Sequence, residues 1–379
     1  MANNNENKIL NVPNLRFPEF SGKWKKCTLG DITINFNLRN KEKIELPMYS
    51  VTNNRGFIPQ SEQFEDRDMV GEDIKAYKII HNKDFAYNPA RINVGSIAKY
   101  NGSKPCMISS LYVCFKAANG IDEDWLMHLL RSPKIQYYYN INGEGGVRIY
   151  LFYPNFARIR TSFPTIAEQR KIANLLSLLD ARITTQNKII EDLKKLKSAI
   201  SHILFSSKGA IHLSEIANVV MGQSPSSNAY NDQGLGMPLV QGNLDISNGK
   251  TTPRLYTAEF NQTTEKGNII LTVRAPVGEV AKATQKVCLG RGVCAIIPHE
   301  ENMSDFIYQY LTFYKFMWRR YEQGSTFTSI NGSDVRNIFC PKVRNVSILT
   351  LLDIKINIEE REVKQYQSQK QYMLYQMFI

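Results

Sequence analysis

Residues 166–205 place the strongest constraint on what this chain can fold into. Positions along this stretch repeat with alternating steps of three and four, the heptad pattern of a coiled-coil helix. The seam consists of Ile172, Leu176, Leu179, Ile183, Gln186, Ile190, Leu193, Lys197, Ile200 and Leu204. Pro164 precedes the stretch and Gly209 follows it, as expected where a helix begins and ends. Such a helix spans about 60 Å and cannot bury its apolar stripe alone, so it requires a partner.

Residues 348–378 are the predicted partner helix. With an offset of 173 residues, ILTLLDIKI aligns with LLSLLDARI of the first helix. The seam continues through Leu349, Leu352, Ile356, Glu359, Val363, Tyr366, Lys370, Met373 and Met377. The polar interruptions also align, Gln186 with Glu359 and Lys197 with Lys370. Either stripe alone would indicate only an ordinary buried helix, but two stripes with the same defects predict a pair within one chain.

The polar seam residues also predict how the two helices pair. A polar side chain buried against leucine loses its hydrogen bonds, at a cost of about 1–3 kcal/mol. An antiparallel register that avoids this places Lys197 against Glu359 and Gln186 against Lys370. The apolar pairs in this register are Ile183 with Met373, Ile190 with Tyr366, Leu193 with Val363, Ile200 with Ile356, and Leu204 with Leu352. A slide of one heptad would instead place Lys197 on Leu352, so the first register is the prediction.

The internal repeat extends beyond the helices, at offsets near 180. Residues 28–32 resemble residues 212–216, and residues 91–98 resemble residues 274–281. The repeat predicts an α+β fold with two similar mixed α/β domains and a pseudo-two-fold tandem arrangement around the helix pair. The expected boundaries are 1–165 for the first domain with an N-terminal strap, 166–207 for the first long helix, 208–342 for the second domain and 343–379 for the second long helix. Residues 122–139 and 304–322 are expected to form one helix in each domain, and residues 269–274 a strand.

Composition narrows the class of protein. The net charge of +12 and the pI near 9.3 favour an acidic partner such as nucleic acid. The six cysteines include no C-x-x-C pair, the N-terminal residues show no apolar signal region, and no apolar run approaches 18 residues. These features predict a cytoplasmic protein with reduced thiols and no zinc site.

Catalytic motifs are absent from the sequence. The five histidines are scattered, and neither H-E-x-x-H nor G-x-S-x-G occurs. Asn88-Pro89-Ala90 only faintly resembles the N-P-P-aromatic motif of adenine methyltransferases, since the second proline and the aromatic residue are missing. The sequence therefore predicts a protein that binds and positions without catalysing, and no cofactor or metal.

Several motifs carry a family resemblance. They are Phe163-Pro164, Glu168-Gln169 followed by the heptads, the opening Leu15-Arg16-Phe17-Pro18-Glu19-Phe20, and Gly222-Gln223-Ser224-Pro225. With the repeated L-L-(S/T)-L-L-D start of both helices, the chain resembles the DNA specificity subunit of Type I restriction-modification enzymes. The resemblance implies that each domain reads one half of a split double-stranded DNA target. It also implies that an antiparallel coiled coil sets the spacing and docks two modification (methyltransferase) subunits, with restriction subunits joining the complex. The Glu168-Gln169 pair has no equivalent before the second helix. The docking of the second modification subunit is therefore expected to differ from that of the first.

Candidate DNA-binding residues are polar or basic side chains in the two domains. In the first domain they are Tyr87, Asn88, Arg91, Lys99 and Arg148, and in the second Gln223, Ser224, Gln241, Asn243, Arg274, Arg319, Arg320 and Ser329. Arg91 and Arg274 occupy the same place in the two repeats, which suits a shared phosphate contact or a structural ion pair. Two other functions remain open from sequence: a DNA methyltransferase or nuclease in its own right, and a coiled-coil scaffold without a DNA role.

Overall fold

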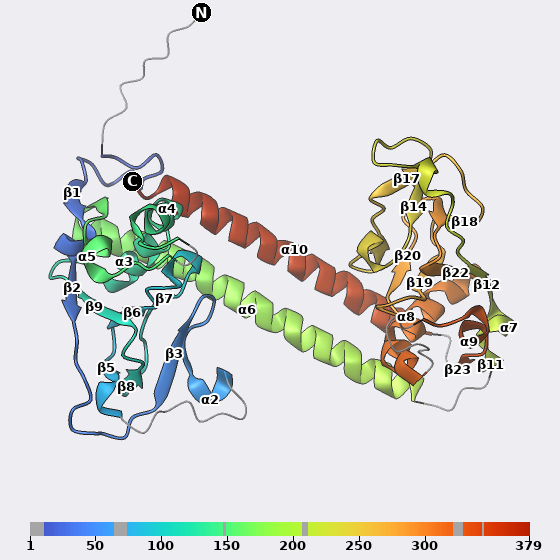
Figure 1. Cartoon of the computed structure of the whole chain (residues 1–379), viewed down its shortest axis with the longest axis horizontal. Coiled ribbons are helices and arrows are strands. Elements are labelled where there is room, and N and C mark those ends of the chain that lie inside the picture. The colour runs from blue at the N-terminus through green and yellow to red at the C-terminus, as the bar shows by residue number, and fades with distance from the viewer. Residues whose placement is uncertain (1–10, 64–73, 147–148, 207–210, 321–328, 343–344) are drawn as a thin grey trace, which may run out of the picture. The chain divides into compact units, whose positions relative to one another are not determined.

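A computed structural model describes residues 11–63, 74–146, 149–206, 211–320, 329–342 and 345–379. The chain divides into two compact units. Unit 1 comprises Met1–Thr185 together with Glu362–Ile379, and unit 2 comprises Gln186–Arg361. Both units therefore contain part of each long helix, and each unit is described by itself below (Figure 1).

Unit 1 contains two four-stranded sheets. The first has the order β2-β9-β6-β7, with β2 at Thr33–Phe36, β9 at Val113–Ala117, β6 at Phe85–Tyr87 and β7 at Ile97–Lys99. The second has the order β4-β3-β8-β5, with β4 at Gly56–Pro59, β3 at Met48–Thr52, β8 at Cys106–Ile108 and β5 at Lys78–Ile80. All pairs are antiparallel except β3 with β8. A separate ribbon pairs β1 (Lys25–Thr28) with β10 (Arg160–Phe163).

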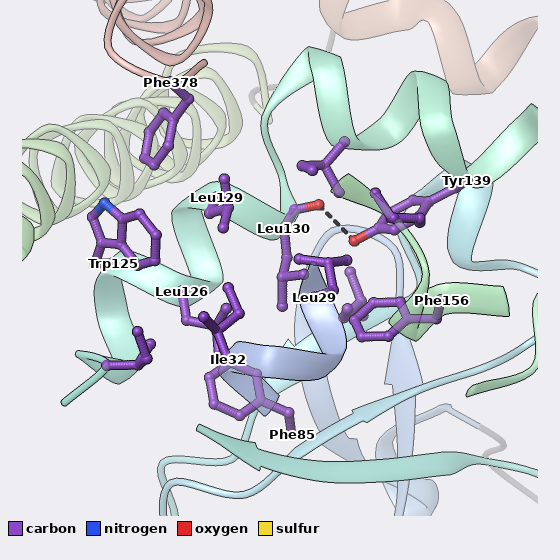
Figure 2. Packing of buried hydrophobic residues seen from close by; sticks show 14 of the residues in the cluster. Leu29, Ile32, Phe85, Trp125, Leu126, Leu129, Leu130, Tyr139, Phe156 and Phe378 are labelled. Atoms are coloured by element: carbon purple, nitrogen blue, oxygen red, sulfur yellow. Dashed lines mark hydrogen bonds between the residues drawn. The ribbon is translucent and has the colours of Figure 1, made fainter. Parts of the chain in front are cut away.

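The helices of unit 1 pack around an aromatic core. They are α1 (Leu29–Ile32), α2 (Gln60–Gln63), α3 (Glu123–Leu130), α4 (Pro133–Asn142), α5 (Tyr153–Ala157), the first half of α6 and the end of α10, with short 3-10 turns at Ile74–Ala76 and Ile92–Val94. Figure 2 shows Trp125 of α3 beside Phe378, and Phe156 near Tyr139, whose hydroxyl donates to the Leu130 carbonyl oxygen at 2.9 Å. The prediction of one helix over residues 122–139 is wrong. Pro133 stands at the first turn of α4, and a proline there starts a new helix.

Unit 2 repeats this strand order with additions. One sheet has the order β12-β22-β19-β20-β16-β15, with β12 at Ala217–Met221, β22 at Val293–Pro298, β19 at Ile269–Thr272, β20 at Val280–Lys282, β16 at Lys250–Thr251 and β15 at Ile246–Ser247. The other has the order β13-β17-β14-β21-β18, with β13 at Tyr230–Asn231, β17 at Leu255–Thr257, β14 at Met237–Val240, β21 at Val287–Leu289 and β18 at Thr263–Thr264. As in unit 1, a parallel pair (β14 with β21) lies in the second sheet. A ribbon of β11 (Ile211–His212) and β23 (Phe339–Cys340) matches the β1–β10 ribbon.

The helices of unit 2 are α7 (Leu213–Ile216), α8 (Ser304–Tyr314), α9 (Gly332–Arg336) and parts of α6 and α10, with 3-10 turns at Ser227–Ala229, Asn243–Asp245, Glu301–Met303 and Lys315–Arg320. The predicted helix over residues 304–322 is thus α-helical only to Tyr314, and its last two residues lie outside the described part. Strand β19 ends two residues before the predicted end at Arg274. The matching order of elements in the two units confirms the internal repeat that the sequence predicts.

The two long helices are α6 (Ile166–Phe205) and α10 (Ser347–Gln376). The first agrees with its prediction at both ends. In unit 1, Asp180 of α6 pairs with Lys370 of α10, and Arg182 lies over the Tyr366 ring. In unit 2, Lys197 pairs with Asp353, and Lys194 with Glu360. Within each unit, contacts later along α6 are made earlier along α10, so both segments run antiparallel, as predicted.

The predicted register is wrong by about one heptad. Lys197 Nζ lies 2.5 Å from Asp353 Oδ1 in unit 2, and Glu359, its predicted partner, pairs with Lys355 of its own helix. In unit 1, Lys370 Nζ lies 2.5 Å from Asp180 Oδ1. Each aspartate directly follows a leucine of the seam. The predicted register was chosen so that no lysine would face such a leucine. A lysine can lay its stem along the apolar seam while its ammonium reaches a carboxylate beside it.

The predicted seam residues are all withdrawn from solvent to some degree. Ile190, Ile356, Glu359 and Val363 are buried, and Ile183, Leu193, Lys197, Ile200, Leu204, Tyr366 and Met373 are half-buried.

An N-terminal strap holds the start of α6 in unit 1. Arg16 donates from Nε and Nη2 to the two carboxylate oxygens of Glu168 at 2.7 and 2.8 Å, and Trp24 Nε1 donates to the same carboxylate at 3.2 Å. The Glu168 side chain is 1% exposed. The Leu15 amide donates to the Gln376 carbonyl oxygen of α10 at 3.1 Å. Glu168 of the Glu-Gln motif therefore joins the strap to α6, whereas Gln169 donates to the Pro164 carbonyl oxygen just before the helix.

Candidate nucleic-acid interface

Unit 2 contains an open cavity of about 600 Å³ lined by polar loops. The loops follow β12 (residues 222–227), β14 (residues 241–245) and β19 (residues 274–275), and a fourth joins β21 to β22 (residues 290–292). All of these loops leave the two sheets of the unit. The two sheets thus hold the walls of the cavity.

Close backbone contact between these loops requires glycine. A Cβ on Gly222 would lie 2.1 Å from the Gly290 carbonyl oxygen, and a Cβ on Gly292 would lie 2.1 Å from the Gln241 carbonyl oxygen. Both distances are too short for any side chain. Ser224 Oγ accepts from the Arg291 amide at 3.1 Å, which joins the G-Q-S-P loop to the β21–β22 loop.

The cavity is positively charged. Arg254, Arg274 and Arg291 line it, and Asp245 is the only carboxylate among its lining residues. Arg254 Nε donates to Asp245 Oδ1 at 3.0 Å, while the Gln241 amide donates to Oδ2 at 2.8 Å. In the part of the chain that the structure describes, Arg274 and Arg291 have no ion-pair partner, and Arg274 is exposed. Three arginines against one aspartate leave a surplus of positive charge, which attracts phosphate.

The structure brings together four of the residues that the sequence singled out in the second domain. Ser224, Gln241, Asn243 and Arg274 all line the cavity. Gln223 is exposed beside it, and Ser329 forms a backbone bridge with Arg274. Arg319 and Arg320 end the 3-10 turn that follows α8, and their side chains lie outside the described residues.

Sequence reasoning missed two of the three arginines that line the cavity, Arg254 and Arg291. Arg291 stands between two glycines, a signal of a tight loop that presents a cation. Arg254 follows a proline directly before β17 and carried no comparable signal.

Among the described residues of unit 1, those singled out from sequence do not line one cavity. Tyr87 is fully buried and stacks on Phe156 with ring centroids 5.3 Å apart, so it belongs to the core. Asn88 Oδ1 accepts from the Ala90 amide at 3.0 Å within a turn, and Arg91 is exposed at the end of that turn. Lys99 pairs with Asp124. Arg148 lies outside the described residues.

The ion pair of Lys99 has a counterpart in unit 2. Lys282 of β20 pairs with Asp305 of α8, as Lys99 of β7 pairs with Asp124 of α3. The same ion pair thus joins sheet to helix in both units. Arg91 and Arg274 also occupy equivalent places in the two units but, unlike the two lysines, neither has an ion-pair partner among the described residues.

Comparisons with known proteins agree with this architecture. Residues 209–365 match the family described as Type I restriction modification DNA specificity domain. The chain is 28% identical to a putative type I restriction enzyme MjaX specificity subunit of Methanocaldococcus jannaschii, over 92% of this chain and 93% of the relative. The structure of a Type I restriction-modification S subunit from M. genitalium superposes with a TM-score of 0.64 at 18% identity, over 97% of this chain and 99% of that one. A chain from a structural study of complex assembly and conformational transition in a type I R-M system gives a TM-score of 0.59 at 20% identity, over 94% and 97%.

The chain is similar to Type I specificity subunits over nearly its whole length. The family matched by residues 209–365 is described as a DNA specificity domain, and the positive charge of the unit 2 cavity agrees with that description. In the described residues of this chain, no cluster of histidine, cysteine and carboxylate side chains could hold a metal ion. Over the same residues, no helix has both the length and the apolar character needed to span a membrane.

One buried titratable group of unit 1 lies where α3 meets α6. His128 is 6% exposed, and its Nε2 lies 3.2 Å from Ser177 Oγ. Burial, and secondarily the ammonium of Lys370, lower the pKa of His128 to about 4. The equivalent position in unit 2 is Gln309, whose Nε2 donates to Asp353 Oδ2 at 2.6 Å. The imidazole is therefore neutral at physiological pH and has a structural role.

Proposed function

We propose that the chain is the non-catalytic subunit that selects the DNA target of a Type I restriction-modification complex, and that each unit reads one half of a bipartite duplex site. The arginine-lined cavity of unit 2 carries this proposal, because it gathers cationic and amide side chains on loops held by rigid strands. Cations attract the DNA backbone without regard to sequence, whereas amide and guanidinium groups distinguish base edges. The repeated strand order of unit 1 supports the assignment of a second half-site to that unit.

The long helices set the distance between the half-sites in this proposal. Their antiparallel segments are fixed in both units by a lysine–aspartate pair, Lys370–Asp180 and Lys197–Asp353. An equivalent ion pair in each unit opposes sliding of one helix along the other. A helix pair that sets the distance between two DNA-recognition units needs this property. The domain boundaries predicted from sequence, at residues 165, 207 and 342, belong to the same proposal.

The modification subunits dock on the helices in this proposal, and restriction subunits join them there. A stripe of exposed apolar side chains on α10 within unit 2 supports docking. Ile348, Leu351, Ile354 and Ile358 follow one another at steps of three and four and are 44–62% exposed. Contiguous exposed apolar surface of this kind is typical of a protein–protein contact. In unit 1, the start of α6 is covered by the Arg16 strap, so the two docking positions differ in their surroundings.

Binding of the full chain to duplex DNA over a range of salt concentrations tests the proposal. The logarithm of the binding constant is expected to fall linearly with the logarithm of salt concentration. Arg274→Ala and Arg291→Ala are each expected to reduce the slope by about one. Lys286→Ala, which removes a lysine paired with Glu265, is the matched control and leaves the slope unchanged. Binding that is insensitive to salt, or no binding, would contradict the proposal and favour a scaffold; methyl transfer by the purified chain alone would instead identify an enzyme.

A further inference from the structure

The three arginines of the unit 2 cavity are held in different ways. Arg254 is fixed through its Nε, which donates to Asp245 Oδ1 at 3.0 Å. Asp245 is itself fixed, because its residue is 3% exposed and its other carboxylate oxygen accepts from the Gln241 amide at 2.8 Å. Its own backbone also accepts from the Thr252 amide at 2.8 Å, which ties it to the segment that leads to Arg254. Arg274 and Arg291 have no carboxylate partner among the described residues.

The Nε contact leaves the end of the Arg254 side chain available. A guanidinium has five N–H donors, of which four are on the two terminal nitrogens. Among the described residues, no hydrogen bond engages those terminal nitrogens, and the side chain is 58% exposed. The result is an oriented fork of donors that faces a polar cavity.

The topologically equivalent arginine of unit 1 is bound differently. Arg55 directly precedes β4, as Arg254 directly precedes β17, and each strand flanks the parallel pair of its sheet on the same side. Arg55 uses a terminal nitrogen, Nη2, to bond Glu62 at 2.8 Å, and both side chains are more than half exposed. Its fork is therefore partly occupied and its support is solvated, in contrast to the buried support of Arg254.

We infer that Arg254 is a specificity-determining residue that reads a guanine in the half-site bound by unit 2. Guanine is the base that presents two acceptors, N7 and O6, side by side in the major groove, and an oriented guanidinium matches both. A phosphate contact would need no such support, and the adjacent carboxylate of Asp245 would weaken it by repulsion. Arg274 and Arg291, which lack a carboxylate, supply phosphate contacts instead. The inference rests on the proposed function.

The test is a selection of duplexes from a fully randomised library, bound by the full-length chain and by its variants. Arg254→Gln removes the charge and the fork, and Arg254→Lys removes the fork while it keeps the charge. Both are expected to lose discrimination for one guanine by about 5- to 150-fold, with the remaining positions unchanged. Arg291→Gln is the matched control from the same cavity, and it is expected to weaken all sequences equally.

Each outcome decides a different point. If the wild-type chain selects a motif and both Arg254 variants select the same one with every guanine retained, the inference is overturned while the proposed function stands. If the wild-type chain selects no motif, the proposed function fails and the inference with it. A circular dichroism unfolding curve checks each variant, and Arg254→Lys, which still offers Asp245 a cation, carries the test if Arg254→Gln does not fold.

Discussion

The pairing of Lys197 with Asp353 makes a prediction that separates the observed helix register from the one favoured by sequence. Asp353 accepts from Lys197 Nζ at 2.5 Å and from Gln309 Nε2 at 2.6 Å. Replacement of both charged residues, singly and together by alanine, gives a double-mutant cycle whose coupling energy measures this pair. The same cycle with Glu359 in place of Asp353 measures the pair expected from sequence.

The magnitudes follow from burial. Asp353→Ala leaves the amide of Gln309 unpaired, and this residue is only 3% exposed, so the loss is about 1–3 kcal/mol. The ion pair itself is partly solvated, since its side chains are 18% and 29% exposed, and it contributes about 1 kcal/mol after screening. Asp353→Ala is therefore expected to lower the free energy of unfolding by about 2–4 kcal/mol, and Lys197→Ala by about 1 kcal/mol.

Urea unfolding of the wild-type chain and the variants provides the assay. The Lys197/Asp353 cycle is expected to give a coupling of about 1 kcal/mol, and the Lys197/Glu359 cycle to be additive within about 0.5 kcal/mol. Glu359 serves as the control because it pairs with Lys355 on its own helix. Coupling to Glu359 without coupling to Asp353 would refute the register and the contacts from which it is read.

Three other predictions address the strap, the buried histidine and the spacer. Arg16→Ala leaves the buried carboxylate of Glu168 without its ion-pair partner and is expected to lower the free energy of unfolding by about 3–5 kcal/mol. Arg170→Ala removes an exposed cation from a solvated pair and is expected to change it by less than about 1 kcal/mol. Equal effects of the two variants in thermal unfolding would contradict this. His128 binds its proton more weakly in the folded chain than in the unfolded chain. The stability that the neutral imidazole contributes is therefore complete above about pH 6.5 and falls by up to about 3 kcal/mol as the pH drops towards 4. Urea unfolding at a series of pH values should show this dependence in the wild-type chain and not in His128→Gln, which places the residue of unit 2 at this position. One heptad inserted near Thr184 and one near Asn357 lengthen the helices by roughly 10 Å. Methylation mapping is expected to show that the gap between the two half-sites widens by about three base pairs. An unchanged gap in an active complex would show that the helices do not set the spacing of the half-sites.

The long helices could be predicted from their heptad period and the repeat from aligned segments, while the antiparallel direction followed from matching the polar seam residues. The register could not, since that argument considered only partners inside the seam. Asp180 and Asp353 stand one position outside it, and a lysine side chain is long enough to reach them. A pairing rule that considers only facing positions ignores the length of the lysine side chain.

The candidate site was predictable where glycine, glutamine and asparagine mark a loop, as at Ser224, Gln241 and Asn243. Tyr87 shows why the rest was not. It follows two apolar residues in a strand, and only the packing of the Phe156 ring against it establishes that it lies in the core. Arg254 shows the converse, because its support from Asp245 depends on a loop closure that no spacing rule encodes.

The most direct test of two independent reading units is an exchange of residues 24–164 for the recognition domain of another specificity subunit. Sequencing of methylated adenines in cells that carry the chimaeric chain with its modification subunits gives both halves of the target at once. The account predicts that one half changes, while the half read by unit 2 and the guanine assigned to Arg254 remain. A change in both halves, or a single continuous motif, would contradict it.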